Sequence, residues 1–237
     1  MHPGLDQIGK AGTPAELWRL LRGYFRAKGY NGLAYFVASR GSIGMRKGFN
    51  IIHRGFPRAV SEAYIDEGLG EFDPGPAFAL STGAPIRWSR VWQMIDPGVE
   101  QQHFLERMRA VGLGDGYNLP VFGPHGRSGN IAVGNVKNET VLDEAPVDEM
   151  HLMAQAAHMR LCQLLPDRPP LEKPLSAREL EILGWVARGK SNSVIADILS
   201  LSGATVDTYL RRIYDKLDVS DRTSAAVRGV GMGLITA

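Results

Sequence analysis

The chain has 237 residues, of which 44% are hydrophobic and 22% are charged, and its 27 basic and 25 acidic residues leave a formal net charge of +2. This composition is that of an ordinary globular protein, and the single Cys162 excludes an intramolecular disulfide. No apolar run reaches the roughly 18 residues of a membrane-spanning helix, and residues 1–13 lack the apolar core of a signal peptide. We therefore expect a cytoplasmic protein without a membrane partner.

A proline-rich stretch divides the chain. Four of the 14 prolines lie between Pro166 and Pro174. Proline has no backbone donor and restricts the residue before it, so a helix cannot continue through this stretch. We predict a semi-rigid linker over residues 166–174, a first domain over residues 1–165 and a second over residues 175–237.

The first domain mixes predicted helices and strands. Thr13, Pro14 and Glu16 form the signature of a helix start, followed by apolar residues at helical spacing through Phe25. Runs typical of strands cover residues 32–39, 49–53, 117–122 and 130–136, and helical patterns cover residues 57–68, 100–111 and 147–165. Because the two kinds of element alternate along the chain, we expect an α/β domain, an α/β/α sandwich around a central antiparallel sheet.

The second domain is predicted to be all α-helical. A capping box at Ser176 starts one helix, and a second begins near Ser193. A tight turn at 201–203 precedes a third helix over 204–217, and a fourth follows from about Asp221. Two short helices joined by a turn that contains glycine are typical of the helix-turn-helix motif.

The third helix of this domain separates an apolar stripe from a polar face. Every third or fourth residue is apolar, so one side packs inward: Val206, Leu210, Ile213 and Leu217. Hydroxyl and basic residues remain outside, and such groups bind phosphates and guanine in the major groove: Thr205, Thr208, Arg211, Arg212 and Lys216. Taken alone, this face is equally consistent with a solvated surface whose basic residues pair with Asp207 and Asp215.

A longer pattern supports DNA binding. It comprises Leu175-Ser-Ala-Arg-Glu179, Gly189-Lys190-Ser191, Ile195-Ala196, Thr205-Val206 and Lys216-Leu217. It resembles the DNA-binding domain of LuxR-type transcription regulators, and the resemblance implies that Glu179 has a structural role. The residues implied to lie near DNA are Lys190, Ser202, Thr205, Thr208 and Arg212. Tyr209 stands where the family usually has His, and it can still donate a hydrogen bond to a phosphate.

A second, sparser pattern lies in the first domain. It comprises Phe56-Pro57, Val60, Tyr64, Phe72-Asp73-Pro74, Trp88 and Gly116-x-x-x-Pro120. This pattern resembles the autoinducer-binding domain of LuxR-type quorum-sensing regulators, which binds acyl-homoserine lactones between a sheet and a layer of helices. The acidic pair, the phosphorylatable aspartate and the lysine of a receiver domain are not evident in the sequence.

The resemblance implies a small-molecule pocket. Asp73 matches the residue that accepts a ligand amide N–H, Tyr64 offers a hydroxyl to an acyl carbonyl, and Trp88 offers an apolar wall. Tyr35, in the first predicted strand, is a further candidate for the lining. Taken singly, Asp73 is better explained as a helix cap and the aromatic residues as plain core; together, at the family's spacing, they favour a pocket.

Two positions depart from the family. Val60 replaces a tryptophan whose indole N–H donates to the lactone carbonyl, and Ala132 replaces a residue that often carries a hydroxyl. One hydrogen bond to a lactone head group is therefore missing, worth about 1 kcal/mol net. Asn118 or a bound water could replace it. Equally, the ligand could belong to another class that joins an amide or a phenol to a hydrophobic tail.

These patterns predict a ligand-responsive transcription regulator that needs no cofactor or metal. One helix-turn-helix reads one half-site, so we expect a homodimer in the major groove of a palindromic operator. The alternatives are a regulator with a non-lactone ligand, a first domain that only dimerises, and an enzyme that hydrolyses the amphiphile. The sequence shows neither the nucleophile and base nor the metal cluster that such an enzyme requires.

Charge is spread evenly over the two domains. Residues 166–237 carry 10 basic and 9 acidic residues, which leaves 17 and 16 for residues 1–165, so each part has a net charge of +1. A nearly neutral DNA-binding domain predicts a modest affinity of the monomer, a need for the dimer and a strong dependence on salt.

Overall fold

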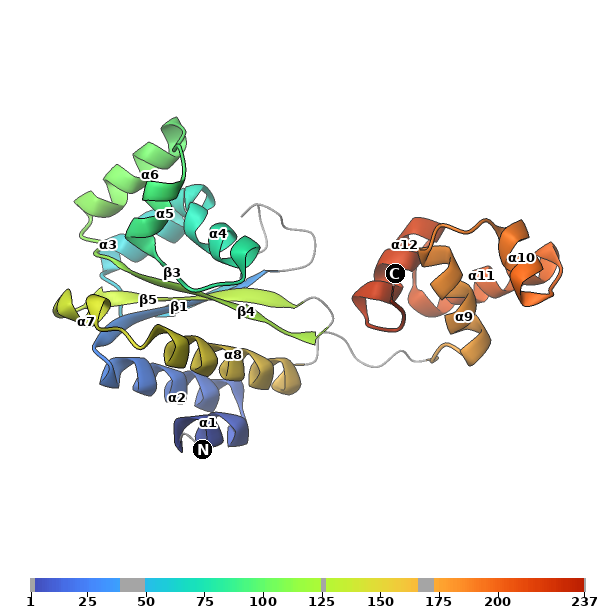
Figure 1. Cartoon of the computed structure of the whole chain (residues 1–237), viewed down its shortest axis with the longest axis horizontal. Coiled ribbons are helices and arrows are strands. Elements are labelled where there is room, and N and C mark those ends of the chain that lie inside the picture. Colours follow the sequence, from blue (N-terminus) through green and yellow to red (C-terminus); the bar gives the residue numbers. More distant parts are fainter. Residues whose placement is uncertain (1–2, 39–49, 125–126, 166–172, 237) are drawn as a thin grey trace. The chain divides into compact units, whose positions relative to one another are not determined.

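The computed structural model describes residues 3–38, 50–124, 127–165 and 173–236 (Figure 1). By its internal contacts the chain divides into two compact units, Met1–Leu165 and Pro166–Ala237, and each is described by itself. Most of the predicted linker, residues 166–172, lies outside the described residues, as do Ser39 and Phe49 at the ends of two predicted strands.

The first unit is built on a five-stranded sheet with the order β2-β1-β5-β4-β3. The strands are β1 (Tyr30–Ala38), β2 (Asn50–Arg54), β3 (Ile86–Arg87), β4 (Gly116–Phe122) and β5 (Ser128–Val136). Every neighbouring pair is antiparallel. Four strands lie within two residues of their predicted positions. The exception, β3, is too short to show the alternation that marks a strand in sequence.

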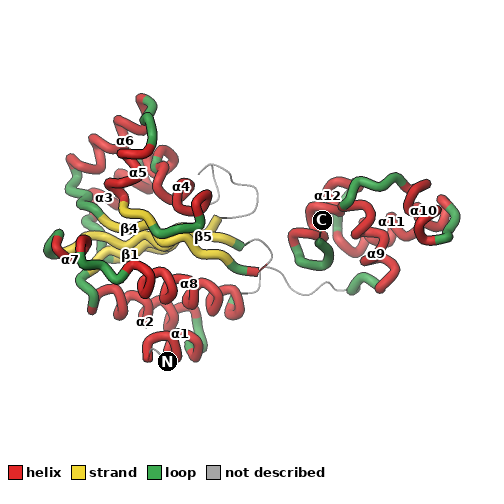
Figure 2. Tube along the Cα trace, viewed as in Figure 1, coloured by secondary structure: helices red, strands yellow, loops and turns green. Residues whose placement is uncertain are grey.

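Helices cover both faces of the sheet, which confirms the predicted sandwich (Figure 2). One layer contains α1 (Pro3–Lys10), α2 (Pro14–Ala27) and α8 (Val147–Leu164). The other contains α3 (Arg58–Ser61), α4 (Pro74–Thr82), α5 (Trp88–Met94) and α6 (Val99–Ala110), and the short α7 (Thr140–Asp143) lies at the edge of the sheet. The sequence patterns did not predict α1, α4, α5 or α7.

The layer of α1, α2 and α8 forms the main core with the sheet. Thr13 caps α2 by accepting a hydrogen bond from the N–H of Glu16, as its sequence signature predicts. Met150, Met153 and Ala157 of α8 are buried in this core, and Leu161 and Leu164 are partly buried against it. This apolar stripe therefore has a structural role within the unit.

The helix predicted over residues 57–68 is not regular. It begins as α3 and widens into a π-helical turn, η1 (Glu62–Asp66), in which the N–H of Glu67 bonds to the carbonyl of Glu62. Gly68 then takes a left-handed conformation with φ of 75°, and a 3-10 turn, η2 (Leu69–Phe72), leads to Asp73. Glycine accommodates this backbone conformation without a steric penalty.

The second unit consists of four helices: α9 (Ala177–Ala187), α10 (Asn192–Leu199), α11 (Gly203–Leu217) and α12 (Arg222–Gly231). The predicted capping box is present, since Ser176 Oγ accepts from the N–H of Glu179 and the Glu179 carboxylate accepts from the N–H of Ser176. Helices α10 and α11 and the turn at Ser202 form the predicted helix-turn-helix. None of the described helices combines the length and apolar character that crossing a membrane requires.

Two methionines on α8 test the packing of the main core. Met153 is 1% exposed and Met159 is 38% exposed. We expect Met153→Ala to lower the free energy of unfolding of the first unit by about 2–5 kcal/mol, because a cavity remains in the core. The matched Met159→Ala should change it by less than about 0.5 kcal/mol. Urea unfolding followed by tryptophan fluorescence measures both, and equal losses would contradict the described packing.

Candidate functional site

A cavity of about 320 Å³ lies in the first unit between the sheet and the layer of α3 to α6. Its floor is formed by residues of four strands that share one face, because side chains two apart on a strand point the same way: Ala34, Phe36, Ile51, His53, Asn118 and Ala132. Ala132 is the register partner of both Ala34 and Asn118. The two alanines leave room above the middle of the sheet.

Asp73 and Tyr64 are the polar pair of this cavity. The Tyr64 hydroxyl donates to Asp73 Oδ2 at 2.8 Å, and the N–H of Gly75 donates to Asp73 Oδ1 at 2.8 Å. Asp73 is thus both the N-cap of α4 and a cavity residue. The structure brings the two predicted residues together, although the Tyr64 hydroxyl points to the carboxylate.

This pair is desolvated, and the basic residue Arg109 that also lines the cavity forms no ion pair with Asp73. Desolvation raises the pKa of the Asp73 carboxyl, while the hydrogen bonds from Gly75 and Tyr64 act in the opposite direction. Desolvation and the nearby Asp73 raise the pKa of Tyr64 well above its ordinary value, so its hydroxyl stays a donor. Among the described residues, no basic side chain forms an ion pair with Asp73. A neutral ligand with an N–H or O–H donor suits this carboxylate.

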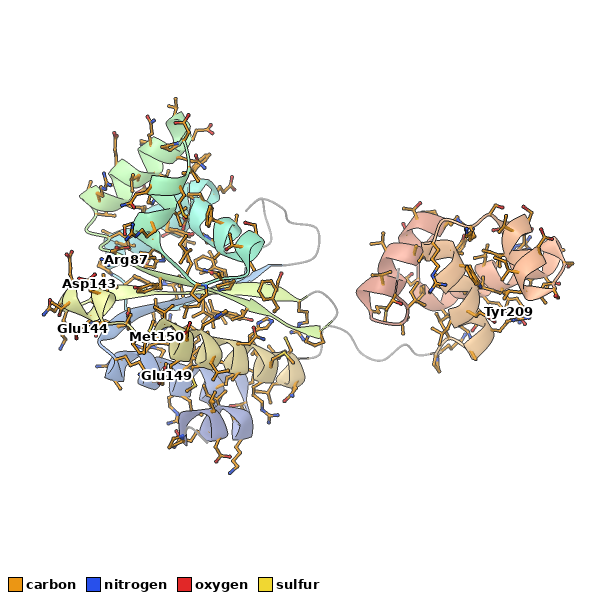
Figure 3. All side chains as sticks on the ribbon, in the orientation of Figure 1. Arg87, Asp143, Glu144, Glu149, Met150 and Tyr209 are labelled. Carbon is orange, nitrogen blue, oxygen red and sulfur yellow. The ribbon has the colours of Figure 1, made fainter. Side chains whose placement is uncertain are left out.

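Trp88 forms an aromatic wall with Phe56, and their ring centroids are 6.3 Å apart. A Cβ atom at Gly116 or at Gly134 would lie 2.8 or 2.4 Å from the Trp88 ring, so both glycines make room for the indole. Asp115 binds the residues on either side of Trp88, because it accepts hydrogen bonds from the Arg87 side chain and from the backbone N–H of Ser89. Arg87 also pairs with Asp143 (Figure 3).

Several cavity residues carried no signal in the sequence. The helical walls include Trp92, Phe104 and Met108, which look like plain core residues in a sequence. Polar groups also line the cavity, among them His53 and Ser61, whose Nδ1 and Oγ are 3.4 Å apart. Val60 borders the cavity as predicted and is an apolar residue without a donor.

Tyr35 does not line the cavity. Its neighbours Ala34 and Phe36 face the cavity, and the alternation of side chains along β1 turns Tyr35 to the opposite face of the sheet. There its hydroxyl lies 2.6 Å from Nδ1 of the buried His158 on α8. The expectation that Tyr35 contributes to the ligand site is therefore corrected.

The outer face of α11 carries the predicted DNA-facing residues. Thr205, Thr208, Tyr209 and Arg212 line a hollow at the surface, and the guanidinium of Arg212 lies 5.9 Å from the centre of the Tyr209 ring. Tyr209 is labelled in Figure 3. Ser202 caps the helix by accepting from the N–H of Thr205. Arg211 is exposed on the same helix. The apolar residues of α11 are buried on its inner side.

A polar network fixes the start of α10 relative to α11 and α12. Asn192 donates to Asp207 at 2.6 Å and accepts from Arg222 at 2.8 Å. Arg222 also donates to the backbone carbonyl of Lys190. This carbonyl contact ties the backbone of Lys190, whose side chain is exposed, to the helix-turn-helix.

The side chain of Lys216 forms hydrogen bonds within the second unit. Its Nζ donates to the carboxylate of Glu179 at 2.7 Å and to the carbonyl of Pro174 at 3.1 Å. Glu179 is 2% exposed. Burial raises the pKa of the Glu179 carboxyl, but the hydrogen bonds from Lys216 and Ser176 outweigh it and leave the pKa below its ordinary value. Lys216, expected to face DNA, is instead the partner of a buried carboxylate.

A ligand-sized cavity in one unit and a helix-turn-helix with a polar face in the other define a ligand-binding transcription regulator. Residues 13–161 match the family described as autoinducer binding domain, and residues 173–228 match the family described as bacterial regulatory proteins, luxR family. The chain therefore belongs to the LuxR family of bacterial regulators, in the branch that carries an autoinducer-binding domain.

Individual relatives agree with this assignment. The quorum sensing-dependent transcriptional regulator RpaR of Rhodopseudomonas palustris is 32% identical, over 76% of this chain and 73% of that protein. The quorum-sensing regulator RhlR of Pseudomonas aeruginosa is 31% identical, over 89% of this chain and 86% of that protein. The crystal structure of Escherichia coli SdiA has the same fold, with a TM-score of 0.77 at 22% identity over 98% of this chain and 96% of that chain.

The ion pair between Lys216 and Glu179 should stabilise the second unit. Lys216→Met leaves a buried carboxylate without its partner and should lower the free energy of unfolding of the second unit by about 3 kcal/mol at neutral pH. The pKa of Glu179 is depressed in the folded state, so the contribution of the pair is lost as the pH falls below its ordinary 4.5. Urea unfolding of the wild type and of Lys216→Met, measured from neutral pH to below 4.5, should show that the difference between their free energies of unfolding becomes smaller as the pH falls.

Lys190→Met is the matched control for this change. The Lys190 side chain is exposed, so its loss should alter the stability of the second unit by less than about 0.5 kcal/mol. Equal effects of the two substitutions, or a difference that persists at low pH, would show that Lys216 does not stabilise Glu179.

Proposed function

We propose that the first unit binds an acyl-homoserine lactone or a similar neutral amphiphile in the cavity above the sheet. The observation that supports this most directly is the Asp73 carboxylate, which lines a mostly apolar cavity without a basic partner among the described residues. A ligand N–H donated to Asp73 satisfies the carboxylate without bringing a charge into the cavity. The aromatic residues around it suit an apolar tail.

The other cavity residues then have distinct roles. Trp88 packs against the head group, and Val60 and Ala132 bound the cavity without forming a hydrogen bond to it. The Tyr64 hydroxyl keeps Asp73 oriented by donating a hydrogen bond to the carboxylate. Binding fills the cavity and stabilises the folded first unit, because the ligand binds the folded state and not the unfolded chain.

We further propose that the second unit binds a palindromic operator as part of a homodimer. One helix-turn-helix reads one half-site, and a two-fold dimer places two of them one helical turn of DNA apart. The residues proposed to contact DNA are Lys190, Ser202, Thr205, Thr208, Tyr209, Arg211 and Arg212. Lys216 is omitted because its ammonium group pairs with Glu179. Leu152 and Met159, exposed on α8, are candidates for the dimer contact.

Ligand binding can be tested at Asp73 and Tyr64. Asp73→Asn removes the charge of the acceptor but can keep the cap of α4, and it should weaken binding of N-octanoyl-homoserine lactone by about tenfold to a hundredfold. Tyr64→Phe should weaken it less. Titration calorimetry measures both, with Asp66→Asn at an exposed position of η1 as the control. Unchanged affinity after both substitutions would refute the proposed pocket.

Incubation of the protein with the same lactone distinguishes a sensor from an enzyme. Mass spectrometry of the lactone after binding should show intact ligand in a stoichiometric complex. Multiple turnovers to a hydrolysed product would favour the enzymatic alternative. Failure of every lactone to bind, together with recovery of another small molecule from protein purified from its native host, would favour the non-lactone regulator.

DNA binding can be tested separately. Duplexes selected from a random-sequence pool should each bind two copies of the protein, and a duplex with a single half-site should bind the protein far more weakly. Arg212→Met should weaken binding and, if Arg212 contacts a phosphate, reduce the slope of log K against log salt by about 1. Fluorescence anisotropy between 50 and 200 mM salt covers the range in which such contacts are lost. Arg178→Met, on α9, is the control and should leave the slope unchanged.

A further inference from the structure

Asn118 is a buried polar side chain in the cavity. It lies on β4, is 2% exposed and contributes to the lining. Its Oδ1 accepts a hydrogen bond from Nδ2 of Asn130 at 2.8 Å. In the part of the chain that the structure describes, its own Nδ2 has no hydrogen-bond partner. Among the described residues the buried atom of this pair without a partner is Asn130 Oδ1, whereas Asn118 Nδ2 belongs to a residue that lines the cavity. An unpaired donor on a cavity-lining residue favours a ligand that supplies an acceptor.

The neighbours of Asn118 determine which end of its amide faces the cavity. Asn130 is 1% exposed and holds the oxygen end from β5. The nitrogen end is directed toward the start of α4, where the Asp73 carboxylate lies. A carboxylate favours a nearby N–H over a nearby carbonyl oxygen. Asn130 is therefore a positioning residue for the donor on Asn118.

The position of Gly75 limits the distance between the amide of Asn118 and the carboxylate of Asp73. A Cβ atom at Gly75 would lie 2.3 Å from Nδ2 of Asn118 and 3.0 Å from Oδ1 of Asp73. The two atoms are therefore separated by at most the sum of these distances, 5.3 Å. They do not bond to each other, so the cavity presents a donor and an acceptor side by side. Any larger residue at position 75 would displace the amide of Asn118.

We propose that Asn118 is the specificity-determining donor of this pocket and replaces the donor that Val60 cannot supply. The proposal rests on the function proposed above, in which Asp73 accepts the N–H of a ligand amide. A trans amide directs its own N–H and C=O to opposite sides. A second acceptor oxygen is therefore needed to reach Asn118, and a carbonyl attached on the nitrogen side of the amide, as in a lactone ring, supplies one.

This arrangement defines the ligand more narrowly than an amphiphile with an amide. The head group carries an N–H and a carbonyl oxygen on the same side, close enough to meet groups no more than 5.3 Å apart. The donor comes from the floor of the cavity on β4, whereas position 60 lies in the helical layer. Trp92 also lines the cavity and has an indole N–H, so it is one competing donor to be tested.

Two matched probes test the role of Asn118. N-octanoyl-homoserine lactone and N-cyclopentyloctanamide share the chain, the amide and a five-membered ring, but only the lactone has the ring carbonyl. Butanoyl forms of both probes cover a shorter chain. We expect the full-length protein to bind the lactone about tenfold more tightly than the cyclopentyl amide in titration calorimetry, as for one hydrogen bond to a carbonyl.

The variants remove this preference selectively. Asn118→Leu, which lacks a donor, and Asn118→Asp, which has a similar shape but presents an acceptor, should bind the two probes with affinities equal within about twofold. Trp92→Phe should keep the tenfold preference. Circular dichroism melting establishes that each variant is folded, and the two different substitutions at position 118 guard against a loss caused by misfolding of either one.

The outcomes distinguish the two proposals. A lactone preference that survives in both Asn118 variants, or that disappears in Trp92→Phe, would overturn the role of Asn118 while leaving amphiphile binding intact. A wild-type protein that binds neither probe at either chain length would overturn this inference together with the proposed lactone function. Equal binding of both probes by the wild type would overturn the inference alone.

Discussion

The hydrogen bond from Tyr64 to Asp73 is the interaction on which the first unit's site depends. It joins the irregular segment that follows α3 to the start of α4, and therefore holds two parts of the helical layer over the sheet. Its acceptor would otherwise be a carboxylate without any side-chain donor beside an apolar cavity. Such a group is costly to bury, so the same bond that shapes the cavity also keeps an acceptor available inside it.

Local signals in the sequence predicted the elements whose structure is decided locally. The caps at Thr13 and Ser176 bond to nearby backbone groups, and the structure has them as expected. The long strands and α8 are marked by their apolar periodicity. The π-helical turn at Glu62–Asp66 has no such signal, because it is set by the packing of the helical layer on the sheet.

The placement of single side chains was less predictable. Tyr35 is one residue away from two cavity residues, and the register of β1 in the sheet turns it to α8. Lys216 belongs to an exposed face by helical periodicity, but a carboxylate 37 positions earlier in the chain binds it. Asp73, Tyr64 and Trp88 were predicted in the cavity by resemblance to a family, since none of them is distinctive alone, and Asn118 only as a replacement for the donor missing at Val60.

The contact of Lys216 with Pro174 has a mechanical consequence. The chain enters the second unit at Pro174, and the Lys216 ammonium fastens that point to the last turn of α11. The chain at Pro174 is thus attached to the helix that is proposed to contact DNA. In the proposed homodimer, the length of residues 166–174 would limit the distance between the two α11 helices, and hence the spacing of the two half-sites of the proposed operator.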